Sequence, residues 1–248
     1  MKLIGLNELK KQMELIVSRA DAYRKGGARL PHIVMNLTHE NGQSLVAAYI
    51  ASVLHDNGLR GFHGLDILLE YSLDGSLKQL KNVFADIKSN AVYTNQYEGV
   101  VAIDISGLSE YINEYQMEYF IEEIGSVARN ATVIIYYDES LGKRMQLIKD
   151  KVSEAIGNHI NVTVPPYSTK EYSEIVVQNI MERGILVESE EELTKILCDA
   201  VDRYHVTSAK EAVAVAEDLV FCADYSDFTP RINVRSVSRH LEKGKLCS

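Results

Sequence analysis

Three short runs of almost wholly apolar residues constrain the fold of this chain most. They are HIVMNL at 32–37, GVVAIDI at 99–105 and ATVIIYY at 131–137. Each run is rich in β-forming residues and too short for a buried helix, which is typical of strands buried on both faces. Amphipathic stretches with helical spacing lie between them, at 43–58, 75–90 and 114–130. Buried strands that alternate with helices predict an α/β fold with a parallel sheet covered on both faces.

The pattern changes at Pro165-Pro166. Before this pair, residues 7–25 are predicted to form a first helix, and 65–72 and 159–164 two further strands. After it, no strand pattern remains, and four segments have helical spacing, at 168–184, 189–204, 207–227 and 231–244. Three of them open with Ser or Thr followed by an acid or amide, as helix capping favours. The sequence therefore predicts an α/β domain over 1–164 and a small all-helical domain over 165–248.

Charge and composition narrow the possible partners. The formal net charge of -9 disfavours a nucleic-acid-binding surface. No apolar stretch reaches the roughly 18 to 20 residues that cross a bilayer, so no membrane contact is expected. The three cysteines are far apart and lack the spacing of metal ligands, as in a protein with free thiols in a reducing cytosol. We expect a cytoplasmic protein that binds no metal through cysteine and no nucleic acid.

The stretch LTHENGQS at 37–44 has the layout of a phosphate-binding loop, because it joins a buried strand to a long helix. Such loops follow the pattern G-x-x-x-x-G-K-[ST], in which glycines let backbone N–H groups approach phosphates, the lysine reaches the β and γ phosphates, and the hydroxyl holds Mg²⁺. Here Gly42 and Ser44 match. Leu37 replaces the first glycine, and Gln43 replaces the lysine.

These replacements predict weak phosphate binding. Glu40 adds a carboxylate inside the loop, which at about 4 Å would repel a phosphate charge by roughly 1 to 4 kcal/mol. Gln43 can still donate a hydrogen bond, but neutral hydrogen bonds are about half as strong as those from a charged group. The loop is therefore interpreted as the remains of a nucleotide site.

Four stretches resemble the AAA+ ATPases, and within them the branch of red-type rubisco activases and stage V sporulation protein K. They are GLNELKKQMELIV at 5–17, DILLEYSLDGSLKQL at 66–80, SEAIGNHINVTVPPYSTKEY at 153–172 and INVRSVSRHLEKG at 232–244, in the order that this branch has them. The resemblance implies a P-loop NTPase-like (AAA+) core followed by a helical lid.

The resemblance also implies roles for single residues. Asp104 stands where the family has a Mg²⁺ ligand, and Ile105 replaces the glutamate that orients the attacking water. Ala155 stands at the position of the arginine finger, a group worth about 10³ to 10⁵ in rate. Arg235 matches the arginine of the lid that contacts nucleotide, and Tyr71 matches the pore-loop aromatic that grips a threaded peptide. A strand-end acid, a solvated arginine and an ordinary tyrosine remain the alternatives for Asp104, Arg235 and Tyr71.

This chain lacks the loop glycine, the lysine, the water-orienting acid and the arginine finger. No catalytic residue is therefore expected. This predicts a pseudo-ATPase that acts as a scaffold or regulatory partner of a protein, either an active AAA+ subunit or further copies of itself, with no cofactor. The alternative is a divergent NTPase that remodels a protein client. It would hold ATP or ADP at Gly42, Gln43, Ser44, Asp104 and Arg235, with weak Mg²⁺ binding at Ser44 and Asp104.

Overall fold

The computed structural model describes residues 3–38, 40–60, 68–90, 98–225 and 229–242. Its contacts divide the chain into two compact units. The first contains Leu6–His39 and Gln43–Val164, and the second contains Pro165–Ser248 together with Lys2–Gly5 and Glu40–Gly42.

The first unit is built on a five-stranded parallel sheet. Its strands lie in the order β2-β3-β4-β1-β5, and they are β1 (His32–Asn36), β2 (Leu68–Ser72), β3 (Val100–Asp104), β4 (Thr132–Tyr137) and β5 (His159–Thr163). Every residue of β1, β3 and β4 is buried, whereas the edge strands β2 and β5 are partly exposed. The three continuous apolar runs are thus the interior strands, because only these are covered on both faces.

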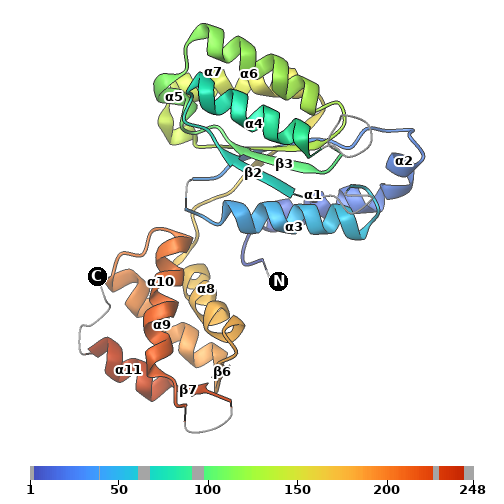
Figure 1. Cartoon of the computed structure of the whole chain (residues 1–248). Helices are drawn as coiled ribbons and strands as arrows, with labels where there is room; N and C mark the ends of the chain where they lie inside the picture. The colour runs from blue at the N-terminus through green and yellow to red at the C-terminus, as the bar shows by residue number, and fades with distance from the viewer. Residues whose placement is uncertain (1–2, 39, 61–67, 91–97, 226–228, 243–248) are drawn as a thin grey trace. The chain divides into compact units, whose positions relative to one another are not determined.

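Helices cover both faces of this sheet (Figure 1). One face carries α1 (Asn7–Ser18) and α3 (Gln43–Asp56), and the other carries α4 (Leu77–Ser89), α6 (Glu114–Val127) and α7 (Lys143–Ile156). Phe84 of α4 and Phe120 of α6 meet in the core with ring centroids 5.9 Å apart. The predicted α/β fold is confirmed.

Local details differ from the sequence prediction. The helix expected over 7–25 divides at Arg19 into α1 and the short α2 (Ala20–Arg24). The short helix α5 (Leu108–Tyr111), the 3-10 turn η1 (Glu139–Leu141) and helix α7 were not predicted. The buried residues of α7 do have helical spacing, at Met145, Ile148, Val152 and Ile156, but charged residues between them make the segment polar on average. Residues 65–67 of the predicted second strand lie outside the described residues.

The second unit is mainly helical. It contains α8 (Thr169–Glu182), α9 (Glu190–Arg203), α10 (Ala209–Leu219), the 3-10 turn η2 (Val220–Cys222) and α11 (Val234–Glu242) around its own apolar core. The expectation of an all-helical lid was wrong in one detail, because β6 (Leu186–Val187) and β7 (Arg231–Ile232) form a short parallel pair. Strands of two residues are too short to show a period in the sequence.

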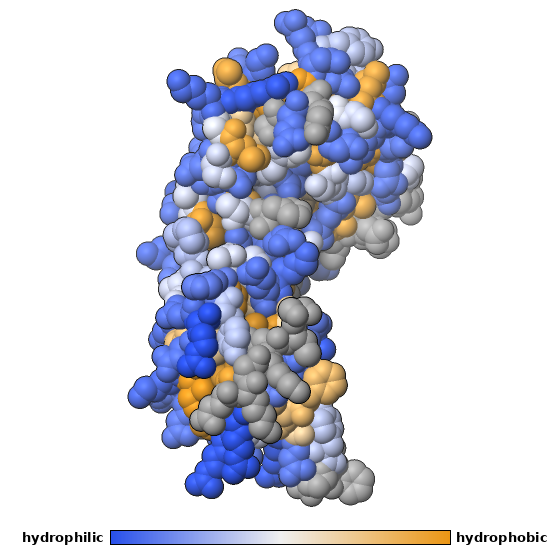
Figure 2. All heavy atoms as spheres, turned by 90° about the vertical axis from the view of Figure 1, so that its left-hand side faces the viewer, coloured by the Kyte–Doolittle hydropathy of each residue, from blue (hydrophilic) through white to orange (hydrophobic). Residues whose placement is uncertain are grey.

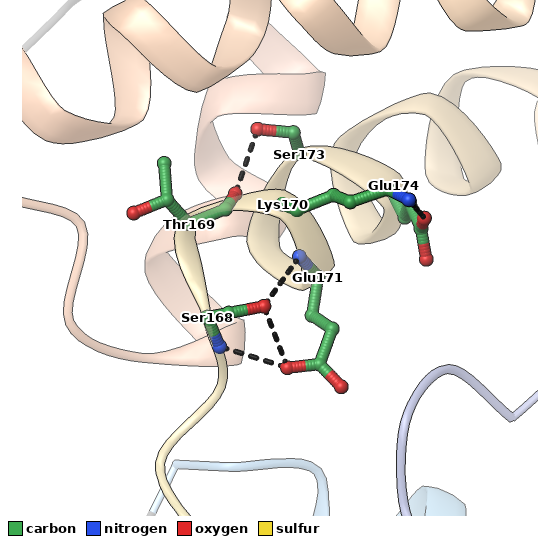
Figure 3. Close-up of polar contacts among 6 residues, drawn as sticks. All are labelled: Ser168, Thr169, Lys170, Glu171, Ser173 and Glu174. Carbon is green, nitrogen blue, oxygen red and sulfur yellow. Dashed lines mark hydrogen bonds and ion pairs between the residues drawn. The ribbon is translucent and has the colours of Figure 1, made fainter.

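Capping fixes the start of α8, as the sequence suggested. Ser168 accepts the N–H of Glu171 on its hydroxyl oxygen at 3.3 Å, and the Glu171 carboxylate accepts the N–H of Ser168 at 2.8 Å (Figure 3). A second capping box joins Ser208 and Glu211 at α10. Each box satisfies two backbone donors that the first turn leaves open.

In the described residues, no helix is both long and apolar enough to cross a membrane. Figure 2 shows apolar side chains on the face it draws as separate patches among hydrophilic ones. The most exposed large apolar residue in the described part of the chain is Phe221, which is 83% exposed.

Candidate nucleotide site at the carboxyl edge of the sheet

The loop from β1 to α3 begins with an aliphatic side chain in the core. Leu37, which replaces the first glycine of the phosphate loop, is 2% exposed, and its N–H donates to the carbonyl of Tyr137 at 3.0 Å. Later in the loop, Gly42 has φ 82 and Glu40 has φ 68. Glycine adopts this left-handed conformation freely, whereas a residue with a Cβ such as Glu40 is strained by about 1 to 2 kcal/mol.

Gln43 is the first residue of α3, and its side chain is held by the sheet. Its Nε2 donates to Oδ2 of Asp104 at 3.2 Å and to the carbonyl of Leu37 at 3.4 Å. The hydroxyl of Tyr136 donates to the backbone carbonyl of Gln43 at 2.9 Å. Burial, with Glu70 and Asp104 adding to it, raises the pKa of Tyr136, so this hydroxyl stays protonated. The residue at the lysine position is thus tied to the ends of β3 and β4.

Asp104 is 5% exposed and lies at the end of β3. Besides the bond from Gln43, it accepts the N–H of Ser106 on Oδ1 at 2.9 Å. Both carboxylate oxygens therefore bond to neutral donors of the protein. A Mg²⁺ ion at Asp104 would have to share these oxygens with the hydrogen bonds that they already accept.

The same turn recurs at the ends of three neighbouring strands. Asp74 after β2, Asp104 at β3 and Asp138 after β4 each accept the N–H of the residue two positions on, at 2.8, 2.9 and 2.9 Å. The donors are serines in each case, so the sequence carries DGS, DIS and DES at these points. Aspartate favours this local turn because its short side chain reaches its own backbone.

These aspartates line a cavity of about 580 Å³ at the carboxyl edge of the sheet. Glu110 adds a fourth carboxylate, and Ser72, Gln79 and Ser106 add neutral polar side chains to its wall. Neither lysine nor arginine is among the described residues that line it. The described residues that line this cavity include none of the phosphate loop. An anion in the cavity would meet like charge, each pair at about 4 Å repelling by roughly 1 to 4 kcal/mol.

Ser44 and Ile105 complete the comparison with a working nucleotide site. Ser44 follows Gln43 in the first turn of α3 and is exposed, and within the described residues no hydrogen bond joins it to Asp104. Ile105 is fully buried, and its N–H donates to the carbonyl of Tyr136 at 2.9 Å. The position of the water-orienting acid is therefore part of the core.

Glu40 has a counter-charge, which the sequence analysis did not foresee. Glu40 belongs to the second unit by its contacts. Its carboxylate pairs with Nζ of Lys210 at 2.6 Å, and its carbonyl accepts the N–H of Lys210 at 3.2 Å. Next to it, Asn41 accepts the N–H of Ala209 on its side-chain oxygen at 3.2 Å. The repulsion expected from Glu40 is therefore reduced by the charge of Lys210.

Ala155 lies in α7, where this helix packs closely on α6. A Cβ placed on Gly125 of α6 would lie 3.3 Å from the carbonyl oxygen of Ala155. The pair of small residues thus has a packing role, and nothing cationic stands at the finger position itself.

Tyr71 lies inside β2, where it pairs with Ile103 of β3. Its hydroxyl donates to Oδ2 of Asp86 in α4 at 2.6 Å. Tyr71 therefore has a local hydrogen-bond partner, and its role in a pore loop stays a prediction.

Arg235 lies on an exposed position of α11, in the second unit. The structure thus brings Gln43 and Asp104 together and describes Arg235 on a separate unit. The contact of Arg235 with nucleotide stays a prediction.

Sequence reasoning missed Asp74, Glu110 and Gln79 as part of this site. Parallel strands end at one edge of the sheet, and this rule would have indicated Asp74 and Asp138, which follow β2 and β4, as neighbours of Asp104. Glu110 lies in α5, so its position needed the structure. In the described residues, no group of three or more histidine, cysteine, aspartate or glutamate side chains is arranged to hold a metal ion.

The chain is similar to solved structures of two proteins from Thermotoga maritima. It aligns with RuvB, a Holliday junction branch migration motor, at 16% identity over 97% of this chain and 70% of that chain, with a TM-score of 0.60. A RuvB point mutant gives the same identity and coverage with a TM-score of 0.63. Domain III of the replication initiation protein DnaA aligns at 12% identity over 88% of this chain and 85% of that chain, with a TM-score of 0.52.

No protein-family model matches the sequence, and no curated protein matches it significantly. At these identities the structural likeness shows the fold alone, which is the P-loop NTPase-like fold of AAA+ proteins. The narrower resemblance to the rubisco activase and sporulation protein branch stays a prediction.

Proposed function

We propose that this chain is a catalytically inactive AAA+-like protein that acts by binding a protein partner. One observation carries the proposal. Gln43, at the position of the phosphate-binding lysine, gives its side-chain amide to Asp104 and to a backbone carbonyl. The contact that would normally go to a phosphate is therefore made within the protein.

The charge around this contact supports the proposal. Four carboxylates and no described lysine or arginine line the adjacent cavity. Catalysis of phosphoryl transfer depends on cations that neutralise charge in the transition state. With Ile105 buried and alanine at position 155, neither water activation nor a finger is supplied at the family's positions.

The proposed partner is a protein, either an active AAA+ subunit or further copies of this chain. RuvB and DnaA are named for work on DNA, but a net charge of -9 disfavours a phosphate backbone as the partner of this chain. Capture from the native host followed by identification of the bound chains tests the first partner, and light scattering over a concentration series tests the second. A labelled duplex bound in physiological salt would contradict the protein-partner proposal.

Nucleotide turnover tests the loss of catalysis. We expect purified protein to hydrolyse Mg-ATP far more slowly than about 1 s⁻¹, within the usual range of enzymes. A rate of that order, abolished by Asp104→Ala, would contradict the proposal. A rate that Asp104→Ala leaves unchanged would indicate a contaminating ATPase.

A double variant tests whether Glu40 and Gln43 are the reason for the weak nucleotide binding that we expect. In Glu40→Gly/Gln43→Lys a cation returns to the loop and a carboxylate leaves it, so calorimetry should detect Mg-ATP binding where wild type shows none. Turnover should stay absent, because Ile105 and Ala155 are unchanged. Gln146→Lys, at an exposed position of α7, is the matched control and should gain nothing. Equal binding by wild type and double variant would show that Gln43 and Glu40 are not what weakens the site.

A second candidate is a divergent ATP- or ADP-binding protein with little or no hydrolysis. The retained Gly42, Ser44 and buried Asp104 favour it. In that case nucleotide at 100 times its dissociation constant would stabilise wild type by about 2.7 kcal/mol. The stabilisation should require Mg²⁺ and weaken in Ser44→Ala. No thermal shift at millimolar Mg-ATP or Mg-ADP would exclude this candidate.

A further inference from the structure

A second and larger cavity lies at the amino edge of the same sheet. It measures about 890 Å³ and is bordered by the starts of β1, β4 and β5 and by the ends of α2, α6 and α7. Its charged lining consists of four arginines and two glutamates, namely Arg24, Arg29, Arg60, Arg129, Glu98 and Glu122. Cations therefore outnumber carboxylates in this cavity, although the chain as a whole has a net charge of -9.

Arg60 is the innermost of these cations. Its side chain is half-buried, and its Nε–H donates to Oγ1 of Thr132 at 2.8 Å. Thr132 itself is 1% exposed, so this bond holds the guanidinium of Arg60 against a buried residue of β4. Burial lowers the pKa of Arg60, and Glu98 opposes this effect without reaching ion-pair distance in the described structure. Arg60 is therefore partly desolvated, and no carboxylate of the described residues forms an ion pair with it.

His32 forms a neutral part of the wall. Its Nδ1 accepts the N–H of Val133 at 3.0 Å. Burial, with Arg60 and His159 adding to it, lowers the pKa of His32 to about 4. At neutral pH His32 therefore adds no charge, and the positive charge of the cavity comes from its arginines.

The remaining arginines lie at the rim and are exposed. Arg24 pairs with Asp21 at 3.2 Å, which leaves Arg29 and Arg129 as the rim cations without a carboxylate partner among the described residues. Arg129 follows the end of α6, whose last carbonyls carry partial negative charge and favour a nearby cation. The volume is within the 300 to 1,000 Å³ typical of small-molecule sites.

We propose that this cavity binds a small oxyanion, with Arg60 as the inner anchor and Arg29 and Arg129 at the rim. Phosphate esters and polycarboxylates share the chemistry that fits, since the guanidinium fork donates two parallel hydrogen bonds to either group. Glu98 and Glu122 would disfavour anions that do not bring enough charge to engage two arginines. This inference does not rest on the proposed function, because none of its residues belongs to the phosphate loop.

Calorimetric titration of the full chain tests the proposal. Phosphate, pyrophosphate and citrate are the probes, each compared with sodium chloride at the same ionic strength. We expect saturable binding of at least one oxyanion and none of chloride. Binding of phosphate and pyrophosphate alone assigns the site to phosphate esters, and binding of citrate alone assigns it to carboxylates.

Two variants locate the site. Arg60→Gln should weaken the bound probe about tenfold or more, because a hydrogen bond to a charged group contributes roughly 1.5 to 3 kcal/mol. Arg129→Gln, at an exposed position, should weaken it severalfold without affecting folding, so it carries the test if Arg60→Gln does not fold. Arg203→Gln removes an exposed arginine of α9 and should leave the affinity unchanged.

Two results would overturn the proposal. One is the absence of saturable binding by all three probes. The other is binding that Arg60→Gln and Arg129→Gln leave unchanged. Asp104→Asn separates this site from the carboxyl edge. Pyrophosphate binding that responds to Asp104→Asn and not to Arg129→Gln would belong to the carboxyl edge, and would count against this inference.

Discussion

The carboxyl edge and the amino edge of the five-stranded sheet carry opposite side-chain charge. Four carboxylates surround the cavity at the carboxyl edge, whereas four arginines against two glutamates surround the cavity at the amino edge. In α/β proteins ligands bind outside the carboxyl ends of the strands, where helices begin. In this chain carboxylates line the cavity at the edge with the usual ligand position, and arginines outnumber carboxylates around the cavity at the opposite edge.

Helix dipoles explain why both arrangements are stable. Helices α3, α4 and α7 begin at the carboxyl edge, where their free N–H groups carry partial positive charge, and α6 and α7 end at the amino edge with partial negative charge. A bound phosphate satisfies helix N-termini in a working nucleotide site. Here Asp74, Asp104 and Asp138 provide negative charge at that edge and accept backbone N–H groups themselves. The helix N-termini at this edge therefore face negative charge that the protein itself supplies.

The largest expected effect concerns His32 at the amino edge. Its pKa is lowered to about 4 from an ordinary value of 6.5, mainly by burial and further by Arg60 and His159. Between these pH values the unfolded chain binds the proton and the folded chain does not. Stability should therefore be fully present above pH 6.5 and fall by up to about 3 kcal/mol as the pH drops to 4.

Urea unfolding of wild type and His32→Gln at several pH values measures this effect. Glutamine can still accept the N–H of Val133 but does not titrate, so the difference in unfolding free energy between the two proteins should shrink as the pH falls. A constant difference from pH 4 to 7 would show that His32 does not titrate in this window. Any loss of stability at low pH would then have to come from other residues.

Next in size is a steric effect at the carboxyl edge. A Cβ on Gly107 would collide with the carbonyl oxygen of Leu73, which is backbone and cannot move aside easily. Gly107→Ala should lower the unfolding free energy by about 1 to 3 kcal/mol, as overpacking commonly does. Gly27→Ala is the control, since its Cβ would lie 3.6 Å from the carbonyl of Ala22, an ordinary contact. Equal effects of the two variants in chemical denaturation would contradict the close packing of this edge.

A smaller effect is expected from the bond that orients Arg60. Thr132→Val keeps the shape of a buried strand residue and removes the acceptor of the Arg60 Nε–H. The loss should be about 1 to 2 kcal/mol, because a buried donor is left without its partner. In Arg60→Met/Thr132→Val both partners are gone, and the cost of adding Thr132→Val should nearly vanish. Additive losses in this double-mutant cycle would show that the two residues do not interact energetically.

The sequence predicted the fold through its apolar runs and missed what depends on neighbours in space. The three interior strands and most helices of the first unit follow from local spacing. Helix α7 was missed because its charged residues dilute its apolar stripe, and β6 and β7 because they have two residues each.

The candidate site shows the same limit. The mismatch at Gln43 follows from one motif, but its bond to Asp104 joins the start of α3 to the end of β3 and needed the sheet order. The arginines of the amino edge come from three separate parts of the chain, at 24–29, 60 and 129, and no motif connects them. Glu40 was predicted as an uncompensated charge because Lys210 is far away in the sequence.

The smallest expected effect tests the charge of both edges with one kind of substitution. Gln43→Lys places a cation beside the buried Asp104, and Asn130→Lys places one in the cavity of four arginines. The first should raise the unfolding free energy by up to about 1 kcal/mol, and the second should lower it by a few tenths of a kcal/mol.

Because both effects are electrostatic, raising the salt from 0.05 to about 1 M should shrink them, the more exposed position more strongly, as the screening length falls to about 3 Å. Equal signs at low salt would break the comparison, since they would mean that the two edges present the same potential to a lysine. Opposite signs that persist unchanged in high salt would instead assign the difference to packing. The comparison is supported only if the two changes in unfolding free energy have opposite signs at low salt and both shrink as salt is added. That result would mean that the carboxyl edge presents a negative potential to a lysine and the amino edge a positive one.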